Sequence, residues 1–176
     1  FIKKILKGVS FEDLKIPFVV VATNLENGEE VNIKDGDLVK AVRASMSVPP
    51  IFQPTRYKNM ILADGGLSNP VPDNIVRKMG ADIVIAVNLD NNHFNKDLNK
   101  RNPTLSAIAM RSINILRFHL AKNCLETADI VIKPKIEESG IIGWGKFFDS
   151  KKASEAIKAG ETAARLVIKD LNKKFE

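Results

Sequence analysis

Apolar residues in the first part of the chain follow the pattern of paired β-strands. A near-continuous apolar run covers residues 17–25, and residues 29–33 then alternate between apolar and polar positions. Between them stands Asn27-Gly28, the dipeptide that tight hairpin turns favour because its backbone reaches positive φ at low cost. The pattern predicts a buried strand, a tight turn and a returning strand.

Helix and strand patterns alternate along the rest of the chain. The expected helices cover residues 38–45, 72–79, 104–123 and the chain from 150 onward, and the expected strands cover residues 59–63, 82–89 and 129–136. Asp35-Gly-Asp37 supplies capping side chains for the first helix, Pro49-Pro50 stops it, and Gly80 is a C-cap for the second. Such alternation is typical of a mostly parallel sheet with helices on both faces. It predicts an α/β layered domain with antiparallel pairing at the first hairpin.

Length and composition limit the class of protein. The chain has 176 residues and a mass of 19.5 kDa, with 44% hydrophobic and 27% charged residues. These values are those of a soluble globular chain, and the length suits one domain. No apolar run reaches the ~18 to 20 residues that cross a bilayer. Cys124 is the single cysteine, which excludes an internal disulfide and favours a cytoplasmic protein.

The net charge of +6 is unevenly distributed. Residues 1–90 hold 11 basic and 11 acidic side chains, whereas residues 91–176 hold 16 and 10. The basic residues are scattered among helical positions and form no run of five or more, so the pattern indicates a solvated face and no nucleic-acid partner. Docking of this basic half on an acidic surface or on lipid headgroups stays open as an alternative.

Asp64 is the best candidate for a catalytic side chain. It follows the apolar residues 60–63 and precedes Gly65-Gly66. A carboxylate at the end of a strand lies where open α/β sheets usually bind ligands, and glycines allow a substrate or backbone to approach closely. Taken alone, however, Asp-Gly is also a common way to begin a turn.

The wider context of this aspartate resembles a known family. Residues 41–54 (Ala-Val-Arg-Ala-Ser-Met-Ser-Val-Pro-Pro-Ile-Phe-Gln-Pro) resemble the segment that precedes the catalytic Asp-Gly-Gly in bacterial patatin-like phospholipases. Three further segments are similar to parts of the same family in the same order: residues 10–29, 64–72 and 148–164. The resemblance implies a three-layer α/β/α patatin-like fold with a mostly parallel central sheet. Residues 1–176 would be the C-terminal portion of one such domain.

The resemblance also implies an activity. Patatin-like enzymes are lipid acyl hydrolases with a nucleophilic serine in Gly-x-Ser-x-Gly, an aspartate in Asp-Gly-Gly that completes a dyad, and a glycine-rich oxyanion loop. Asp64 is the position that matches the aspartate. None of the nine serines stands in Gly-x-Ser-x-Gly, and the nearest segment, Gly66-Leu-Ser68-Asn-Pro70, has proline where the second glycine should be. Ser68 is therefore expected to make a local turn hydrogen bond.

The missing groups define the expected partners. The nucleophile and the oxyanion loop are expected in the protein's own N-terminal segment, without which residues 1–176 are expected to be inactive and prone to association. The other expected partners are a lipid or another ester substrate and a membrane surface contacted peripherally. A non-catalytic scaffold with the same fold is the alternative function.

The sequence predicts no histidine-based catalytic site, no metal site and no nucleotide site. His93 stands in a polar loop and His119 among apolar helical positions, and neither is in a triad-like context. No His, Cys or carboxylate cluster has metal-ligand spacing, so no metal or other cofactor is predicted. Nucleotide binding is disfavoured because Gly-x-Gly-x-x-Gly is absent.

Overall fold

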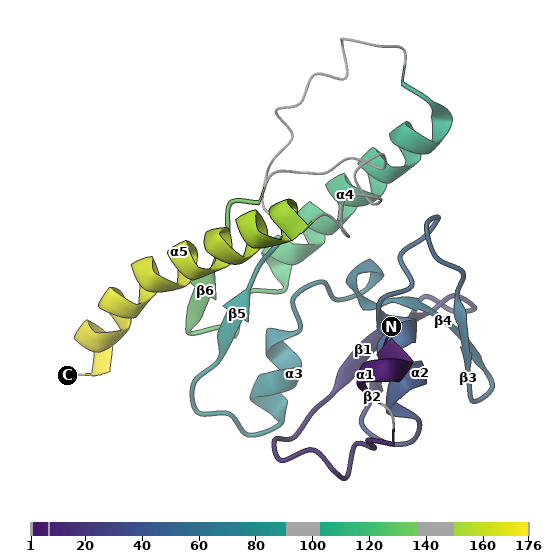
Figure 1. Cartoon of the computed structure of the whole chain (residues 1–176), viewed down its shortest axis with the longest axis horizontal. Helices are drawn as coiled ribbons and strands as arrows, with labels where there is room; N and C mark the ends of the chain where they lie inside the picture. Colours follow the sequence, from purple (N-terminus) through teal and green to yellow (C-terminus); the bar gives the residue numbers. More distant parts are fainter. Residues whose placement is uncertain (1, 7, 91–102, 137–149, 176) are drawn as a thin grey trace. The chain divides into compact units, whose positions relative to one another are not determined.

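The computed structural model describes residues 2–6, 8–90, 103–136 and 150–175, with side chains described for residues 153–168 of the last segment (Figure 1). The chain separates into two compact units, Phe1–Pro70 and Val71–Glu176. Among the described residues no helix is long and apolar enough to cross a membrane.

The first unit is built on a four-stranded sheet in the order β2-β1-β4-β3, in which every neighbouring pair is antiparallel. Its strands are β1 (Val20–Asn24), β2 (Glu30–Ile33), β3 (Thr55–Tyr57) and β4 (Met60–Asp64). Its helices are α1 (Ile2–Ile5), α2 (Leu38–Ser45) and the single 3₁₀ turn η1 (Gly65–Leu67). Asp64 is therefore the last residue of a central strand, β4, with β1 on one side and β3 on the other.

The predicted hairpin between β1 and β2 is confirmed. Val20 pairs with Ile33 and Thr23 with Glu30, and Gly28 takes a φ of +77° in the turn. The Gly28 N–H donates to the carbonyl of Asn24 at 2.8 Å. Glycine suits this position because other residues are strained at such a φ.

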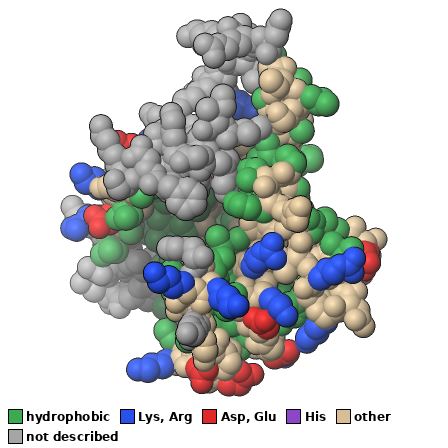
Figure 2. Space-filling view, turned by 45° about the vertical axis from the view of Figure 1, so that its right-hand side comes forward, with side chains coloured by type: hydrophobic (Ala, Val, Ile, Leu, Met, Phe, Trp, Pro, Cys, Tyr) green, Lys and Arg blue, Asp and Glu red, His purple; other side chains and the backbone are tan. Residues whose placement is uncertain are grey.

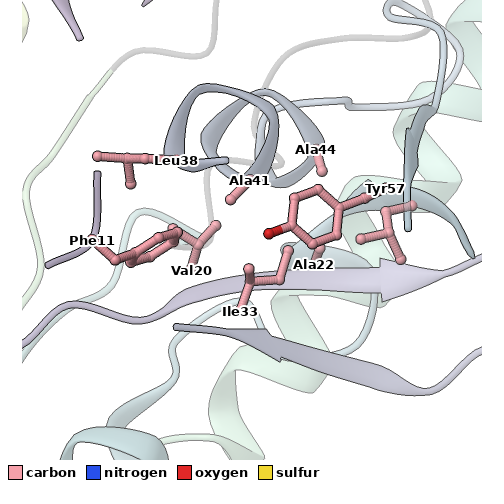
Figure 3. Close-up of a cluster of buried hydrophobic side chains, with 9 residues drawn as sticks. Phe11, Val20, Ala22, Ile33, Leu38, Ala41, Ala44 and Tyr57 are labelled. Atoms are coloured by element: carbon pink, nitrogen blue, oxygen red, sulfur yellow. The ribbon is translucent and has the colours of Figure 1, made fainter. Parts of the chain in front are cut away.

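Helix α2 packs on one face of the sheet and encloses the core of the first unit. Asp37 caps the helix by accepting a hydrogen bond from the Lys40 N–H at 3.0 Å, as the sequence predicts. Figure 3 shows apolar side chains of α2 pointing toward those of β1 and β2. The buried cluster consists of Phe11, Val20, Ala22, Ile33, Leu38, Ala41, Ala44, Tyr57 and Leu62. This packing holds the sheet against a helix whose end leads toward Asp64.

The second unit contains a small parallel pair of strands. Its elements are α3 (Asp73–Lys78), β5 (Ile85–Val87), α4 (Leu105–Asn123), β6 (Ile130–Ile132) and α5 (Ser150–Phe175). Ile85 pairs with Ile130 and Val87 with Ile132 in parallel register. Gly80 has a φ of +94° just beyond α3, which confirms the predicted C-cap.

The α/β class is confirmed, but the prediction of a mostly parallel sheet is wrong for the described chain. Short turns join β1 to β2 and β3 to β4, which makes these two pairs antiparallel. The central strands β1 and β4 are also antiparallel, although β2, α2 and β3 lie between them in the sequence. Among the described strands, parallel pairing occurs between β5 and β6, whose connection contains α4. Strand β3 and helix α1 were not predicted, and β5 and β6 are shorter than the apolar runs at 82–89 and 129–136. The three-layer patatin-like fold stays a prediction.

Candidate functional site

Asp64 is the last residue of β4 and caps the 3₁₀ turn that follows. Its Oδ1 accepts a hydrogen bond of 2.7 Å from the Gly66 N–H. In the sheet, Asp64 is the antiparallel partner of Ala22 in β1. The carboxylate is half-buried. The sequence thus correctly predicted a strand-end carboxylate, which the turn holds in one orientation.

Gly65 allows the turn to lie directly against β1. A Cβ atom built on Gly65 would stand 2.3 Å from the carbonyl oxygen of Val21, a separation that real Cβ atoms do not reach. Gly65 and Gly66 are both buried. Glycine is therefore required next to Asp64 by close backbone approach, which is the role that the Asp-Gly-Gly pattern suggested.

Two hydroxyl groups tie the ends of this turn to β1. Thr23 donates from its Oγ1 to the carbonyl of Asp64 at 2.9 Å, and the same oxygen lies 2.8 Å from the Oγ of Ser68. The Ser68 Oγ is also 3.3 Å from the carbonyl of Gly65, to which it donates. Ser68 therefore makes the local turn hydrogen bond that the sequence predicted.

Ser47 supports Asp64 from the other side of its backbone. The Asp64 N–H donates to the carbonyl of Ser47 at 3.1 Å, and the buried Ser47 Oγ donates to the Arg43 carbonyl at 2.8 Å. The Ser47 hydroxyl also lies 3.3 Å from that of Thr55. The segment 41–54 is thereby brought beside the Asp-Gly-Gly turn, although the two are separate in sequence.

A further hydrogen bond fixes the chain beyond the turn. Asn69 is buried, and its Nδ2 donates to Glu30 Oε2 at 2.6 Å. The Asn69 N–H also donates to the carbonyl of Gly65 at 2.8 Å. The turn is therefore anchored to β2 as well as to β1.

The two histidines, which the sequence analysis also considered, lie far from this turn in the sequence. His119 is exposed on α4, with its ring centroid 5.3 Å from that of Phe118 in an edge-to-face arrangement. His93 lies outside the described residues. Within the described parts of the chain, no group of three or more His, Cys, Asp or Glu residues could hold a metal ion.

Sequence reasoning missed the residues that hold Asp64 in place. Thr23 is the hydroxyl in an otherwise apolar stretch of β1, and that interruption of the pattern was a usable signal. Ser47 stands in the segment 41–54 but gave no sign of its contact with Asp64. Its contact is a backbone hydrogen bond to Asp64, 17 positions away, which no local pattern of side chains reveals.

Fold and site together define a mixed α/β protein with an anchored carboxylate at a strand end. The sequence model of the patatin-like phospholipase family matches residues 1–75, a range that contains this carboxylate. Residues 1–75 therefore belong to the patatin-like phospholipase family, which the resemblance predicted.

Several curated proteins are similar to parts of the chain. An uncharacterized NTE family protein of Mycobacterium bovis is 37% identical over 89 residues, covering 51% of this chain and 25% of the relative. The mouse patatin-like phospholipase domain-containing protein 7 is 36% identical over 92 residues, covering 50% of this chain and 7% of the relative. A putative patatin-like phospholipase domain-containing protein of Caenorhabditis elegans is 26% identical over 173 residues, covering 83% of this chain and 16% of the relative. The chain therefore spans a quarter or less of the length of these relatives.

Proposed function

We propose that this chain supplies the catalytic aspartate, Asp64, of a lipid acyl hydrolase that works through a Ser-Asp dyad. The observation that carries the proposal is the anchoring of the Asp64 carboxylate by the Gly66 N–H within the range matched by the family. Residues 1–176 would form the C-terminal portion of one patatin-like domain. The nucleophilic serine and the oxyanion donors would come from the protein's own N-terminal segment.

In this proposal Asp64 acts as a general base. A serine hydroxyl is a weak nucleophile until a base within ~2.6 to 3.2 Å takes its proton, and a carboxylate can do so without a histidine. The serine oxygen then attacks the ester carbonyl, backbone N–H groups stabilise the oxyanion, and the alcohol leaves with the proton. Asp64 next takes a proton from water, which attacks the acyl-enzyme and releases the carboxylic acid.

The held backbone of Asp64 supports this role. General-base catalysis needs the carboxylate within a narrow distance of its partner, and a misplacement of about 1 Å costs up to ~10²-fold in rate. Hydrogen bonds at the Asp64 N–H, carbonyl and Oδ1 restrict that movement. We also propose a cytoplasmic location, because the chain has a single cysteine and so no internal disulfide.

An activated nucleophilic serine is expected in an enzyme but not in a non-catalytic scaffold. We would treat the full-length protein with a fluorophosphonate, which reacts with activated serines, and locate the label by peptide mass spectrometry. The proposal predicts one labelled serine outside residues 1–176. Labelling should be unchanged in Ser68→Ala, because the Ser68 hydroxyl is engaged in the turn.

Two results would count against the enzyme. Absence of any labelled serine in the folded full-length protein would favour the scaffold that docks on an acidic or lipid surface. Labelling at Ser68 would instead place the nucleophile inside this chain and overturn the division of the dyad.

A further inference from the structure

Helix α4 has apolar residues on two opposite sides. On its inner side, Met110 and Ala121 are buried, and Ala121 packs in a cluster with Val71 and Ala86. This cluster contains none of the exposed leucine and isoleucine residues of the helix. The apolar residues on the outer side are therefore not explained by the core.

The outer side of α4 presents large aliphatic side chains to solvent. Leu105 is 82% exposed, Ile108 46%, Ile115 39% and Leu116 69%. Steps of three, seven and one residues place them on one face of a helix. Figure 2 shows hydrophobic side chains open to the surface in the upper part of the view, where Figure 1 draws α4. A helix that is apolar on both sides is usually covered on both.

The charge of α4 indicates what covers this face. None of its 19 residues is acidic, whereas Arg111, Arg117 and Lys122 are basic. Arg117 is paired with Asp90 at 3.2 Å. Arg111 lies three residues from Ile108 and four from Ile115, so it flanks the exposed face, as Lys122 does one turn beyond Phe118. An apolar face bordered by cations is the pattern of a helix that lies in an anionic lipid interface.

We propose that the outer face of α4 docks on an anionic lipid surface. This lipid-docking face consists of Leu105, Ile108, Ile115 and Leu116 with the flanking Arg111 and Lys122. The inference rests on the proposed function in one respect, since an enzyme for lipid esters has to reach its substrate in a membrane. Docking holds the protein at that surface through contacts that are separate from Asp64.

A second copy of the chain fits this face less well. A symmetric contact would place α4 against α4, and both helices carry only positive charges, which repel each other. A stable protein interface also buries about 1,200 to 2,000 Å² in total, more than a stripe of four aliphatic side chains provides. A bilayer with anionic headgroups meets both the apolar and the basic part of the face.

The test is sedimentation of the full-length protein with vesicles of phosphatidylcholine, with or without phosphatidylglycerol. The double variant Leu105→Ser/Leu116→Ser should bind the anionic vesicles about a hundredfold more weakly, because burial of each leucine contributes roughly tenfold or more. Arg111→Gln and Lys122→Gln should each weaken binding about fivefold, and only to the anionic vesicles. Ile16→Ser is the matched control, since Ile16 is 76% exposed but lies in the first unit.

Two further measurements complete the test: light scattering reports self-association, and hydrolysis of a water-soluble ester reports activity without vesicles. The proposal would be overturned if the leucine variant bound the vesicles as tightly as the parent. It would also be overturned, in favour of a protein interface, if the leucine variant lost self-association but kept vesicle binding. The Asp64→Asn variant should still bind vesicles, and the leucine variant should still hydrolyse the soluble ester. Failure of ester hydrolysis in all variants would therefore contradict the enzyme without contradicting the docking face.

Discussion

The side-chain hydroxyl of Thr23 donates a hydrogen bond of 2.9 Å to the backbone carbonyl of Asp64. Thr23 and Ser68 have one hydroxyl proton each for three short contacts, at 2.8, 2.9 and 3.3 Å. All three are satisfied together when Thr23 donates to Asp64 and Ser68 shares its proton between the Thr23 hydroxyl and the Gly65 carbonyl in a three-centre hydrogen bond. This relay fixes the backbone at the point where the carboxylate leaves β4, so Thr23 is a positioning residue for Asp64.

The first prediction concerns this relay. Thr23→Val keeps the shape of the side chain but leaves the Asp64 carbonyl without its donor. Without this hydrogen bond the Asp64 carboxylate is less well positioned, so we expect kcat on a soluble ester to fall roughly tenfold with little change in KM. Thr23→Ser restores the hydroxyl and should restore kcat. Equal kcat in the valine variant and the parent would contradict the positioning role.

The second prediction concerns the glycine beside the carboxylate. Gly65→Ala places a Cβ atom 2.3 Å from the Val21 carbonyl oxygen, so β1 and the turn must move apart. We expect a loss of about 1 to 3 kcal/mol in the free energy of unfolding, the usual cost of overpacking. Gly160→Ala is the control, because Gly160 lies in α5 and a Cβ atom there would meet nothing within 4 Å beyond its neighbours and the backbone of its own helix. That variant should gain roughly 0.8 to 1 kcal/mol by helix propensity.

Urea denaturation of both glycine variants measures the difference. Unfolding of Gly65→Ala at the same denaturant concentration as the parent would show that the turn does not depend on the close approach to β1.

The third prediction concerns the pH dependence of stability in the second unit. Hydrogen bonds from the Val84 N–H at 2.8 Å and from Arg77 hold the pKa of Asp129 below its usual value of 3.8. A carboxyl whose pKa is lower in the folded state stabilises the fold fully above the unfolded pKa, and this contribution is lost as the pH falls through the folded pKa. The parent should therefore lose stability in acid below pH 3.8 partly through Asp129.

Asp129→Asn isolates that contribution. The variant should be less stable than the parent at neutral pH, and the difference should shrink as the pH falls below 3.8. Urea unfolding at neutral pH and in this acid range measures both. A stability difference that stays constant or grows in acid would contradict the assignment of the lowered pKa to the folded state.

Local features of the fold could be predicted from the sequence because their causes are local. The hairpin follows from Asn27-Gly28, and the start of α2 follows from the capping side chain of Asp37. Asp64 was predicted at a strand end because an apolar run stops there. These features depend on residues only a few positions apart.

The support around Asp64 could not be predicted in the same way. Thr23 and Asp64 are 41 positions apart, and they meet only because β1 and β4 are antiparallel neighbours. Alternation of helices and strands favours a parallel sheet on average, but it does not determine which strands pair. The prediction of a parallel sheet therefore gave no reason to expect the contact between Thr23 and Asp64.

The most direct test of the account is the rate of ester hydrolysis by the Asp64→Asn variant of the full-length protein. Asparagine keeps the shape and the hydrogen bond to Gly66 but is not a base, so kcat/KM on a soluble short-chain ester should fall ~10²-fold or more. Asp35→Asn is the matched control, because Asp35 is an exposed carboxylate in the same unit that pairs with Lys58, and its rate should equal that of the parent. Undiminished turnover by a correctly folded Asp64→Asn protein would contradict the assignment of Asp64 as the general base.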